Sequence, residues 1–183
     1  AVADGVNYPD RDWSFPVALK KAAATVYKET GITDPIEDLD VIEIYDAFTS
    51  QHLIWLEGLG LCPDGRAAMD LIDSGATKMD GKIPVNPSGG VLSNNSIGGS
   101  AMIRQAEVAL QIMNKAGERQ VKDAEIGLAH GWGGAIQFHT VMILSGEKDI
   151  KDSFQKRKDR KAKELERLVI STPMGGQPGY KIK

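Results

Sequence analysis

Stretches with helical and strand-like periodicity alternate along the chain. Apolar residues recur at helical spacing over residues 17–27, 53–56 and 102–113, a further short helix is expected over 66–74, and β-branched runs cover 39–44, 126–129 and 135–144. The order helix, strand, helix, loop, helix, strand, strand is typical of a layered α/β fold. Few strands are visible for a chain of 183 residues, so we expect this fold to be incomplete by itself.

The segment Asn86–Ser100 is the least ordinary part of the chain. It begins with Asn-Pro-Ser-Gly-Gly, which is typical of a tight turn. A helix is expected to begin near Ser96, with Asn95 or Ser96 as its cap and Gly98 in its first turn. The buried side of this helix is expected to hold Met102, Ala106, Leu110 and Met113. Free N–H groups at such a helix start suit a negative or carbonyl-bearing ligand, although a tight turn without a ligand explains the residues equally well.

Two more polar or Gly-rich segments follow predicted strands. Tyr45 and Asp46 come where the first strand meets a helix, which is where α/β folds place their ligands. His130 begins the segment His-Gly-Trp-Gly-Gly, which is expected to interrupt a strand, and Gly133 and Gly134 expose main-chain N–H groups there. Each segment also has a structural explanation, since Asp46 can cap the helix and a lone histidine is more often structural than catalytic.

The cysteine and histidine content excludes several kinds of site. Cys62 is the only cysteine, so neither a disulfide nor a cysteine-ligated metal site can form within the chain, and we interpret this residue as structural. The three histidines, His52, His130 and His139, lack metal-ligand spacing, and we expect His139 to be a packed or solvated strand residue. No apolar run is long enough to span a membrane and no signal peptide is visible, so we expect a cytoplasmic protein.

The end of the chain differs in charge from the rest. Residues 147–183 hold 11 Lys and Arg against 6 Asp and Glu, about +5, whereas residues 1–146 hold 11 against 19, about −8. We therefore divide the chain into a domain of residues 1–146 and a basic, partly helical extension of residues 147–183. Dense charges and sparse apolar residues predict a solvated arm that docks a partner. Without interleaved aromatic residues, nucleic-acid binding is not expected.

Three separated parts of the sequence resemble the C-terminal half of thiolases, most closely the sterol-carrier-protein-type and archaeal branches. They are Asp40–Thr49, then Gly58–Gly65 with Asn86–Gly90, and finally Ala116–Val121 with Leu128–Gly134. Their order and spacing agree with the family over roughly residues 15–146. The resemblance implies a layered αβαβα fold made of two similar halves, of which this chain supplies the second. The nucleophilic cysteine of thiolases lies in the first half, and no segment here matches its motif.

The resemblance also assigns roles to residues of this chain. Asn95 aligns with the histidine of the family's Gly-His-Pro element and is expected to donate a hydrogen bond to a thioester oxygen. Tyr45 stands where relatives carry histidine or asparagine, and it is expected to orient a substrate oxygen. His130 lies in the loop that often holds the acid/base cysteine, and it is expected to carry a proton. The candidate substrate-binding residues are Ser96, Gly98, Gly133 and Gly134.

These residues indicate part of a thiolase-like acyl-CoA acyltransferase that makes or breaks a carbon–carbon bond beside a thioester carbonyl. A coenzyme A thioester is the expected substrate, and no permanently bound cofactor is expected. The alternatives are a retro-aldolase of the same superfamily and a non-catalytic acyl-CoA-binding scaffold. The resemblance implies three partners: an N-terminal half or subunit, a second protomer in a thiolase-type dimer, and a separate zinc-ribbon/OB-fold acyl-CoA-binding protein. Neither nucleic acid nor a membrane is expected as a partner.

Overall fold

The computed structural model describes residues 2–3, 12, 14–134 and 136–171. The helices are α1 (Val17–Thr30), α2 (Pro35–Asp38), α3 (Thr49–Gly58), the π-helix η1 (Ala68–Asp73), α4 (Gly90–Ser93), α5 (Ser100–Ile112), the 3-10 turn η2 (Gly117–Arg119) and α6 (Ile150–Ser171). The strands are β1 (Val2–Ala3), β2 (Val41–Glu43), β3 (Ile126–Gly133) and β4 (Phe138–Ser145).

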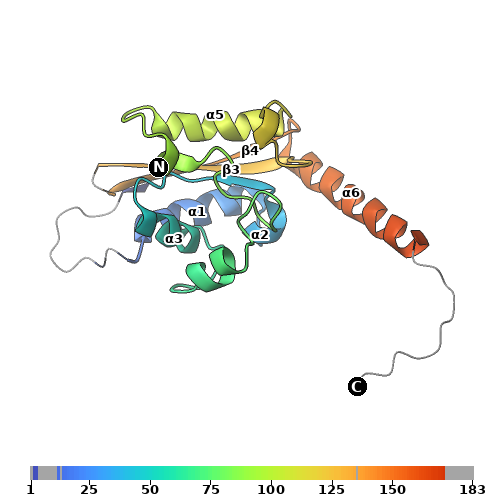
Figure 1. Ribbon diagram of the computed structural model, residues 1–183, viewed down its shortest axis with the longest axis horizontal. Helices are drawn as coiled ribbons and strands as arrows, with labels where there is room; N and C mark the ends of the chain where they lie inside the picture. Colours follow the sequence, from blue (N-terminus) through green and yellow to red (C-terminus); the bar gives the residue numbers. More distant parts are fainter. Residues whose placement is uncertain (1, 4–11, 13, 135, 172–183) are drawn as a thin grey trace, which may run out of the picture.

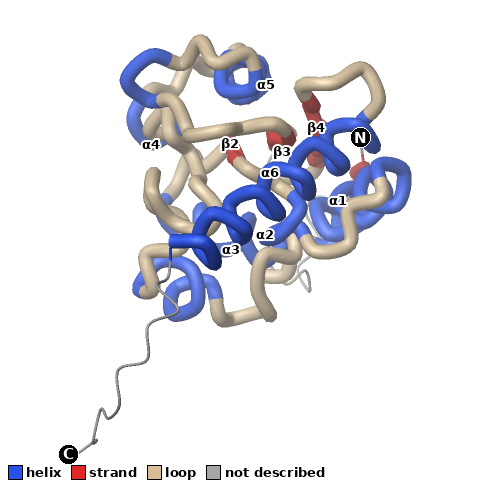
Figure 2. The backbone as a smooth tube through the Cα atoms, turned by 90° about the vertical axis from the view of Figure 1, so that its right-hand side faces the viewer, coloured by secondary structure: helices blue, strands red, loops and turns tan. Residues whose placement is uncertain are grey.

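A mixed sheet with the strand order β1-β4-β3-β2 forms the middle of the molecule. β2 runs parallel to β3, and β4 is antiparallel to both β3 and β1. Figure 1 shows α5 on one face of this sheet and α1 and α3 on the other. The view along the strands in Figure 2 separates the same layers, with α5 on one side of β2, β3 and β4 and α1 on the opposite side. The predicted layered α/β fold is therefore confirmed.

Glycines in β3 allow α5 to lie directly against the sheet. A Cβ atom on Gly127 would stand 2.5 Å from Val108 Cγ1, and one on Gly131 would stand 2.7 Å from Ala101 Cβ. Ala101 is at the start of α5, so the first turn of the helix lies over the carboxyl end of β3. This packing brings the loop before α5 to the edge of the sheet where β2 and β3 both end.

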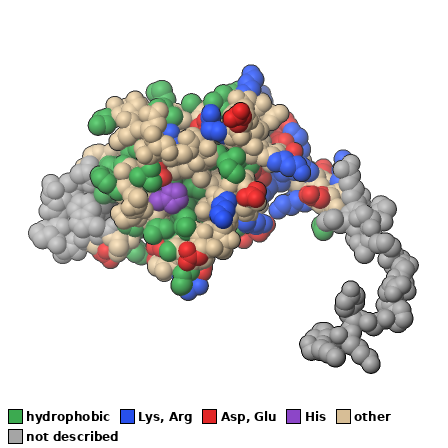
Figure 3. Space-filling model, in the orientation of Figure 1, with side chains coloured by type: hydrophobic (Ala, Val, Ile, Leu, Met, Phe, Trp, Pro, Cys, Tyr) green, Lys and Arg blue, Asp and Glu red, His purple; other side chains and the backbone are tan. Residues whose placement is uncertain are grey.

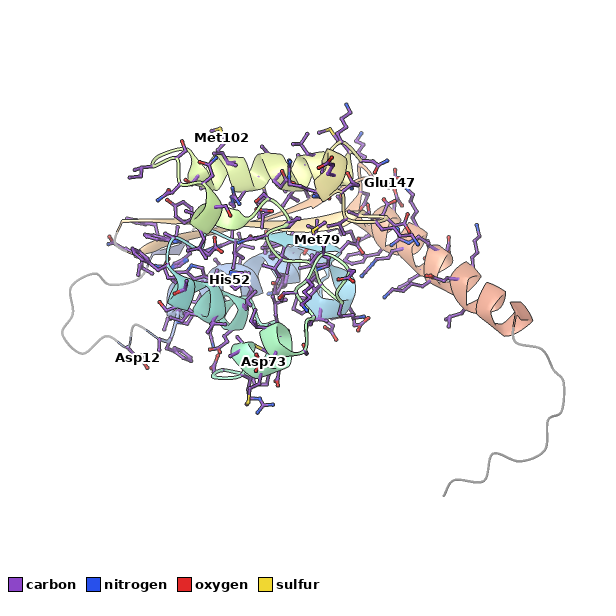
Figure 4. All side chains as sticks on the ribbon, in the orientation of Figure 1. Asp12, His52, Asp73, Met79, Met102 and Glu147 are labelled. Carbon is purple, nitrogen blue, oxygen red and sulfur yellow. The ribbon has the colours of Figure 1, made fainter. Side chains whose placement is uncertain are left out.

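The side of α5 that faces the sheet is polar. Its buried side chains include Ser100, Arg104, Glu107 and Gln111. By contrast, Met102 is 72% and Met113 is 52% exposed, and Figure 4 shows Met102 on the outer side of the helix. The apolar side of α5 was predicted to be buried, and within this chain that prediction is wrong. The periodicity was real, but the side that it defines points away from the sheet.

Three predicted boundaries also differ from the structure. α5 begins at Ser100 and not near Ser96, because Gly98 has φ +88°, which a right-handed helix excludes. β3 continues through His130 to Gly133, so the Gly-rich segment extends the strand and does not interrupt it. The helix expected over residues 66–74 is the six-residue π-helix η1.

The first turns of α6 are attached to the body of the protein. Arg157 is buried, donates hydrogen bonds to the main-chain oxygens of Glu37 and Leu39, and forms an ion pair with Asp40 at 2.9 Å. Phe154 packs against the main hydrophobic core. The rest of α6 projects away from the body (Figure 1). The first turns of α6 are therefore not solvated, and β4 ends at Ser145, just before the predicted extension begins.

α6 is 22 residues long but densely charged. In the part of the chain that the structure describes, no helix is both long and apolar enough to span a bilayer. A groove of about 810 Å³ lies between α6 and the segment before β3, and it is lined mainly by charged side chains. Figure 3 shows Lys, Arg, Asp and Glu side chains gathered where α6 leaves the body. The predicted site residues do not line this groove, so it is separate from the site described below.

Candidate functional site

The segments that carry the predicted site residues lie at one edge of the sheet. β2 and β3 are parallel, so their carboxyl ends meet at the same edge, with Tyr45 following β2 and Gly133 ending β3. The loop that carries Asn95 reaches this edge because α5 begins over Gly131. In α/β folds this is the usual place for ligands.

A buried ion pair attaches the Asn-Pro-Ser-Gly-Gly loop to β2. Both carboxylate oxygens of Glu43 accept hydrogen bonds from Ser88, one from its N–H at 3.0 Å and one from its hydroxyl at 2.8 Å. Arg104 Nη1 lies 2.6 Å from Glu43 Oε2 and also donates to the Ser88 hydroxyl. Burial raises the pKa of Glu43 to about 7, while Arg104 and Ser88 act in the opposite direction. This network fixes β2, the loop and α5 relative to one another.

Asp46 is the second attachment point of the same loop. Its carboxylate accepts hydrogen bonds from the Val91 N–H and from Asn86 Nδ2, both at 2.8 Å, and from His52 Nδ1 at 2.9 Å. Asp46 is only 2% exposed. A Cβ atom on Gly90 would stand 2.5 Å from Asp46 Oδ1, so this position must be glycine for the carboxylate to reach the main chain. The helix-cap explanation of Asp46 is wrong, because its carboxylate binds the loop and the His52 side chain and not the main-chain N–H groups of α3.

Asn95 lies in an exposed loop just before α5. Its Oδ1 is 3.0 Å from the Ser100 hydroxyl, which also lies 2.8 Å from the main-chain oxygen of Ser96. An asparagine amide has two N–H groups, and this contact uses at most one of them in either orientation of the amide. Asn95 therefore keeps at least one donor for a ligand. Ser96 and Gly98 are exposed in the same loop and do not belong to the helix.

Tyr45 is half-buried against two tryptophans. Its main-chain oxygen accepts hydrogen bonds from the indole N–H groups of Trp55 and Trp132, each at 2.9 Å. Its ring lies edge-on to Trp132, with 5.1 Å between the ring centroids. The tyrosine hydroxyl forms no hydrogen bond with any residue that the structure describes, so it remains able to bind a substrate oxygen.

His130 is enclosed by neighbouring side chains. It is 1% exposed, its Nδ1 accepts from the Tyr45 N–H at 3.4 Å, and its Nε2 lies 3.1 Å from Nδ1 of His139. Burial, and next the neighbouring His139, hold the pKa of His130 well below its ordinary value of 6.5. Both ring nitrogens are thus engaged inside the protein. This placement contradicts direct proton transfer to a substrate and makes His130 a positioning residue for Tyr45.

His139 is also 1% exposed, and its ring lies 5.0 Å from that of Trp55 and 5.4 Å from that of His130. The expectation that His139 is merely a packed or solvated strand residue therefore understated its position. It belongs to the buried aromatic cluster beneath Tyr45. A substitution of His139 would therefore disturb the packing of this cluster and lower the stability of the protein.

Gly133 and Gly134 lie at the turn between β3 and β4. Gly134 has φ +59°, and a Cβ atom there would stand 2.7 Å from the Phe138 ring, so the hairpin itself requires this glycine. A Cβ atom on Gly133 would meet nothing within 4 Å. Substrate binding by these two glycines stays a prediction.

Glu43, Arg104 and His52 were not predicted as site residues from the sequence. Glu43 left a signal, since it is a charged residue within the apolar run Val41–Ile44. Arg104 left none, because polar residues on a helix usually face solvent. His52 is six residues from Asp46, and no local period brings these two side chains together.

Comparisons with known proteins show the family relationship of the chain. Residues 6–146 match the family model described as "Thiolase C-terminal domain-like". Sterol carrier protein 2 of Homo sapiens is 41% identical over 120 residues, which cover 64% of this chain and 21% of that protein. The benzoylsuccinyl-CoA thiolase subunit BbsB of Thauera aromatica is 37% identical over 129 residues, covering 69% of this chain and 33% of that protein. The chain thus spans between a fifth and a third of these relatives.

A solved structure shares the fold. The structure titled "Ltp2-ChsH2(DUF35) aldolase" matches with a TM-score of 0.68 and 24% sequence identity, covering 81% of this chain and 38% of that chain. At this level of identity the match supports the fold alone.

Proposed function

Because the chain belongs to the thiolase C-terminal domain-like family, we propose that it forms part of an enzyme that makes or breaks a carbon–carbon bond in an acyl-CoA thioester. The coenzyme A thioester is the substrate, and the reaction needs no permanently bound cofactor. The names of the relatives support this choice, since one is a benzoylsuccinyl-CoA thiolase subunit. The reacting centre lies at the edge of the sheet beside Asn95 and Tyr45.

The free donor of Asn95 is the observation that carries this proposal. Carbon–carbon bond cleavage or formation next to a thioester passes through an enolate, whose oxygen needs a fixed hydrogen-bond donor. Asn95 offers an amide N–H in a loop that Asp46 and Glu43 attach to the sheet through Val91 and Ser88. The N-terminus of α5 adds positive potential beside it. The Tyr45 hydroxyl then orients the second substrate oxygen, while His130 holds the main chain of Tyr45.

A partner half completes the site. The outer side of α5 and the adjoining loop expose apolar side chains that a monomer would normally bury: Leu92 at 50%, Ile97 at 90%, Met102 at 72% and Met113 at 52%. We propose that an N-terminal thiolase half or subunit covers this surface and supplies the nucleophilic cysteine. A thiolase-type dimer and a zinc-ribbon/OB-fold acyl-CoA-binding protein complete the proposed assembly.

A retro-aldolase is the second candidate, because this chain offers no reactive thiol to the site. Cys62 is the only thiol in the chain, and burial raises its pKa to about 11, which suits neither a nucleophile nor an acid/base group at neutral pH. Retro-aldol cleavage needs no acyl-cysteine. A nucleophilic cysteine in the partner half decides for the acyltransferase, and its absence decides for the aldolase.

The test is the substitution Asn95→Ala in the assembled complex. Loss of one oxyanion donor typically costs about 2.7–4 kcal/mol, so turnover should fall roughly a hundredfold or more. Asn94→Ala is the matched control, because Asn94 is the exposed neighbour in the same loop. Equal turnover in the two folded variants and the wild type would overturn Asn95 as the oxyanion donor.

A further inference from the structure

An aspartate–histidine pair lies beside the proposed reacting centre and has no role in it so far. His52, in the first turn of α3, places Nδ1 2.9 Å from Asp46 Oδ2. An ionised carboxylate can only accept hydrogen bonds, so the His52 nitrogen that faces Asp46 carries the proton. The other ring nitrogen, Nε2, then has its lone pair free. In hydrolases, the same pairing fixes the tautomer and orientation of a catalytic base.

His52 is the only histidine of the chain that a substrate can reach. His130 and His139 are each 1% exposed, whereas the side chain of His52 is 21% exposed. Figure 3 shows a single patch of histidine surface, flanked by hydrophobic side chains, and Figure 4 labels His52 at this place. An accessible ring beside apolar surface suits contact with a substrate that is largely hydrocarbon.

Asp46 connects His52 to the loop of the proposed oxyanion donor. The same carboxylate that holds His52 also binds the Val91 N–H, four residues before Asn95. Phe48 and Leu92, from the two segments that Asp46 joins, are 61% and 50% exposed. The base, its carboxylate and the loop therefore form one rigid unit at the carboxyl end of β2.

We propose that His52 is the catalytic base of this site and exchanges a proton with the α-carbon of an acyl-CoA thioester, an inference that rests on the proposed function. In the synthetic direction, Nε2 takes the α-proton and the C–H electron pair becomes the enolate. The enolate oxygen is held by Asn95. In the cleavage direction, the protonated ring returns this proton to the α-carbon of the enolate that bond cleavage leaves. No oxidant, reductant or further reactant is needed.

A purely structural role for His52 would be to hold Asp46. Glutamine at this position also offers an N–H to the carboxylate but cannot accept and release a proton. His52→Gln therefore separates the two roles. Arg66→Gln is the matched control, because it removes one partner of an exposed ion pair with Asp70 that lies outside the site.

The first experiment measures hydrogen exchange at the α-carbon of acetyl-CoA in D₂O by mass spectrometry, with the assembled complex. This partial reaction does not require an acyl-cysteine. General-base catalysis typically contributes a factor of about 10²–10⁴, so His52→Gln should slow exchange at least about a hundredfold. His52→Ala should recover part of the rate on addition of imidazole, and Arg66→Gln should match the wild type.

The second experiment needs no turnover. Diethyl pyrocarbonate should modify His52 in the wild-type complex and leave His130 and His139 intact, and acetyl-CoA should protect His52. Normal exchange in His52→Gln, or modification that acetyl-CoA does not reduce, overturns the assignment of His52 while leaving the proposed function standing. A wild-type complex that neither exchanges the α-hydrogens nor binds acetyl-CoA overturns the proposed function, and this inference with it.

Discussion

Arg104→Met should destabilise the protein strongly, and more so at high pH than at low pH. Arg104 is 1% exposed and lies 2.6 Å from the buried carboxylate of Glu43. Methionine keeps an unbranched side chain and a similar helix propensity but removes the charge and the hydrogen bonds to Glu43 and Ser88. The variant thus leaves a buried carboxylate without its counter-ion.

The expected loss is about 3–5 kcal/mol, the usual cost of removing one partner of a buried ion pair. For a chain of this size, each kcal/mol lowers the melting temperature by about 2–4 °C, which gives a fall of roughly 6–20 °C. The double variant Glu43→Gln/Arg104→Met removes the unpaired charge as well. The double variant should recover much of the lost stability, because the cost of the single substitution comes mainly from the unpaired charge. Residues in contact therefore do not contribute additively.

The pH dependence follows from the pKa of Glu43, which burial raises from an ordinary 4.5 to about 7. The folded state therefore binds this proton more tightly than the unfolded state, and its stability falls as the pH rises from about 4.5 through about 7. Arg104 limits this fall by stabilising the ionised form. Without Arg104 the pKa of Glu43 rises further, so the penalty should be smaller near pH ~5.5 than near pH ~8.5.

Urea unfolding of the wild type and both variants, followed by circular dichroism at these two pH values, measures the effect. Each protein should be studied in the assembly in which it is purified. A penalty of the same size at both pH values would refute the electrostatic reasoning. So would a double variant that is no more stable than Arg104→Met.

Three more predictions concern stability. The pKa of His130 is lowered, so the unfolded state binds more protons below pH 6.5, and His130→Gln should flatten the loss of stability on acidification in urea unfolding curves. Gly127→Ala should lower the free energy of unfolding by about 1–3 kcal/mol, because the added methyl group crowds α5 against the sheet. Gly133→Ala, with open space around it, should lower it less, and thermal unfolding of both variants measures the difference. Truncation after Gly146 removes the docked turns of α6 and should lower the melting temperature, whereas truncation after Lys161 should leave it nearly unchanged.

Much of the fold could be predicted because it depends on local patterns. The helical spacing of α1 and the β-branched runs of β2 and β4 each lie within a few turns or residues of chain. Turn chemistry likewise located the Asn86–Gly90 loop correctly. Tyr45 was placed at the end of β2, because a strand that meets a helix leaves its polar residues at the edge of the sheet.

The start and orientation of α5 could not be predicted in the same way. The apolar period shows that one side of the helix is suited to burial. It does not show whether the sheet of this chain or another protein packs against that side. The polar side faces the sheet because Arg104 reaches Glu43, which is 61 residues away in sequence. The helix start moved to Ser100 because the main chain at Gly98 is left-handed, a conformation that glycine permits but does not impose.

The sequence by itself determined the layers, the Gly-rich loops and the edge of the sheet at which the candidate site lies. Only the tertiary structure decided which histidine can meet a substrate. His139 faces His130 across the β3–β4 hairpin and seals it from solvent, whereas Asp46 holds His52 at the surface. Accessibility and hydrogen-bond partners depend on contacts between segments that are distant in the chain, and a local pattern of residues cannot predict those contacts.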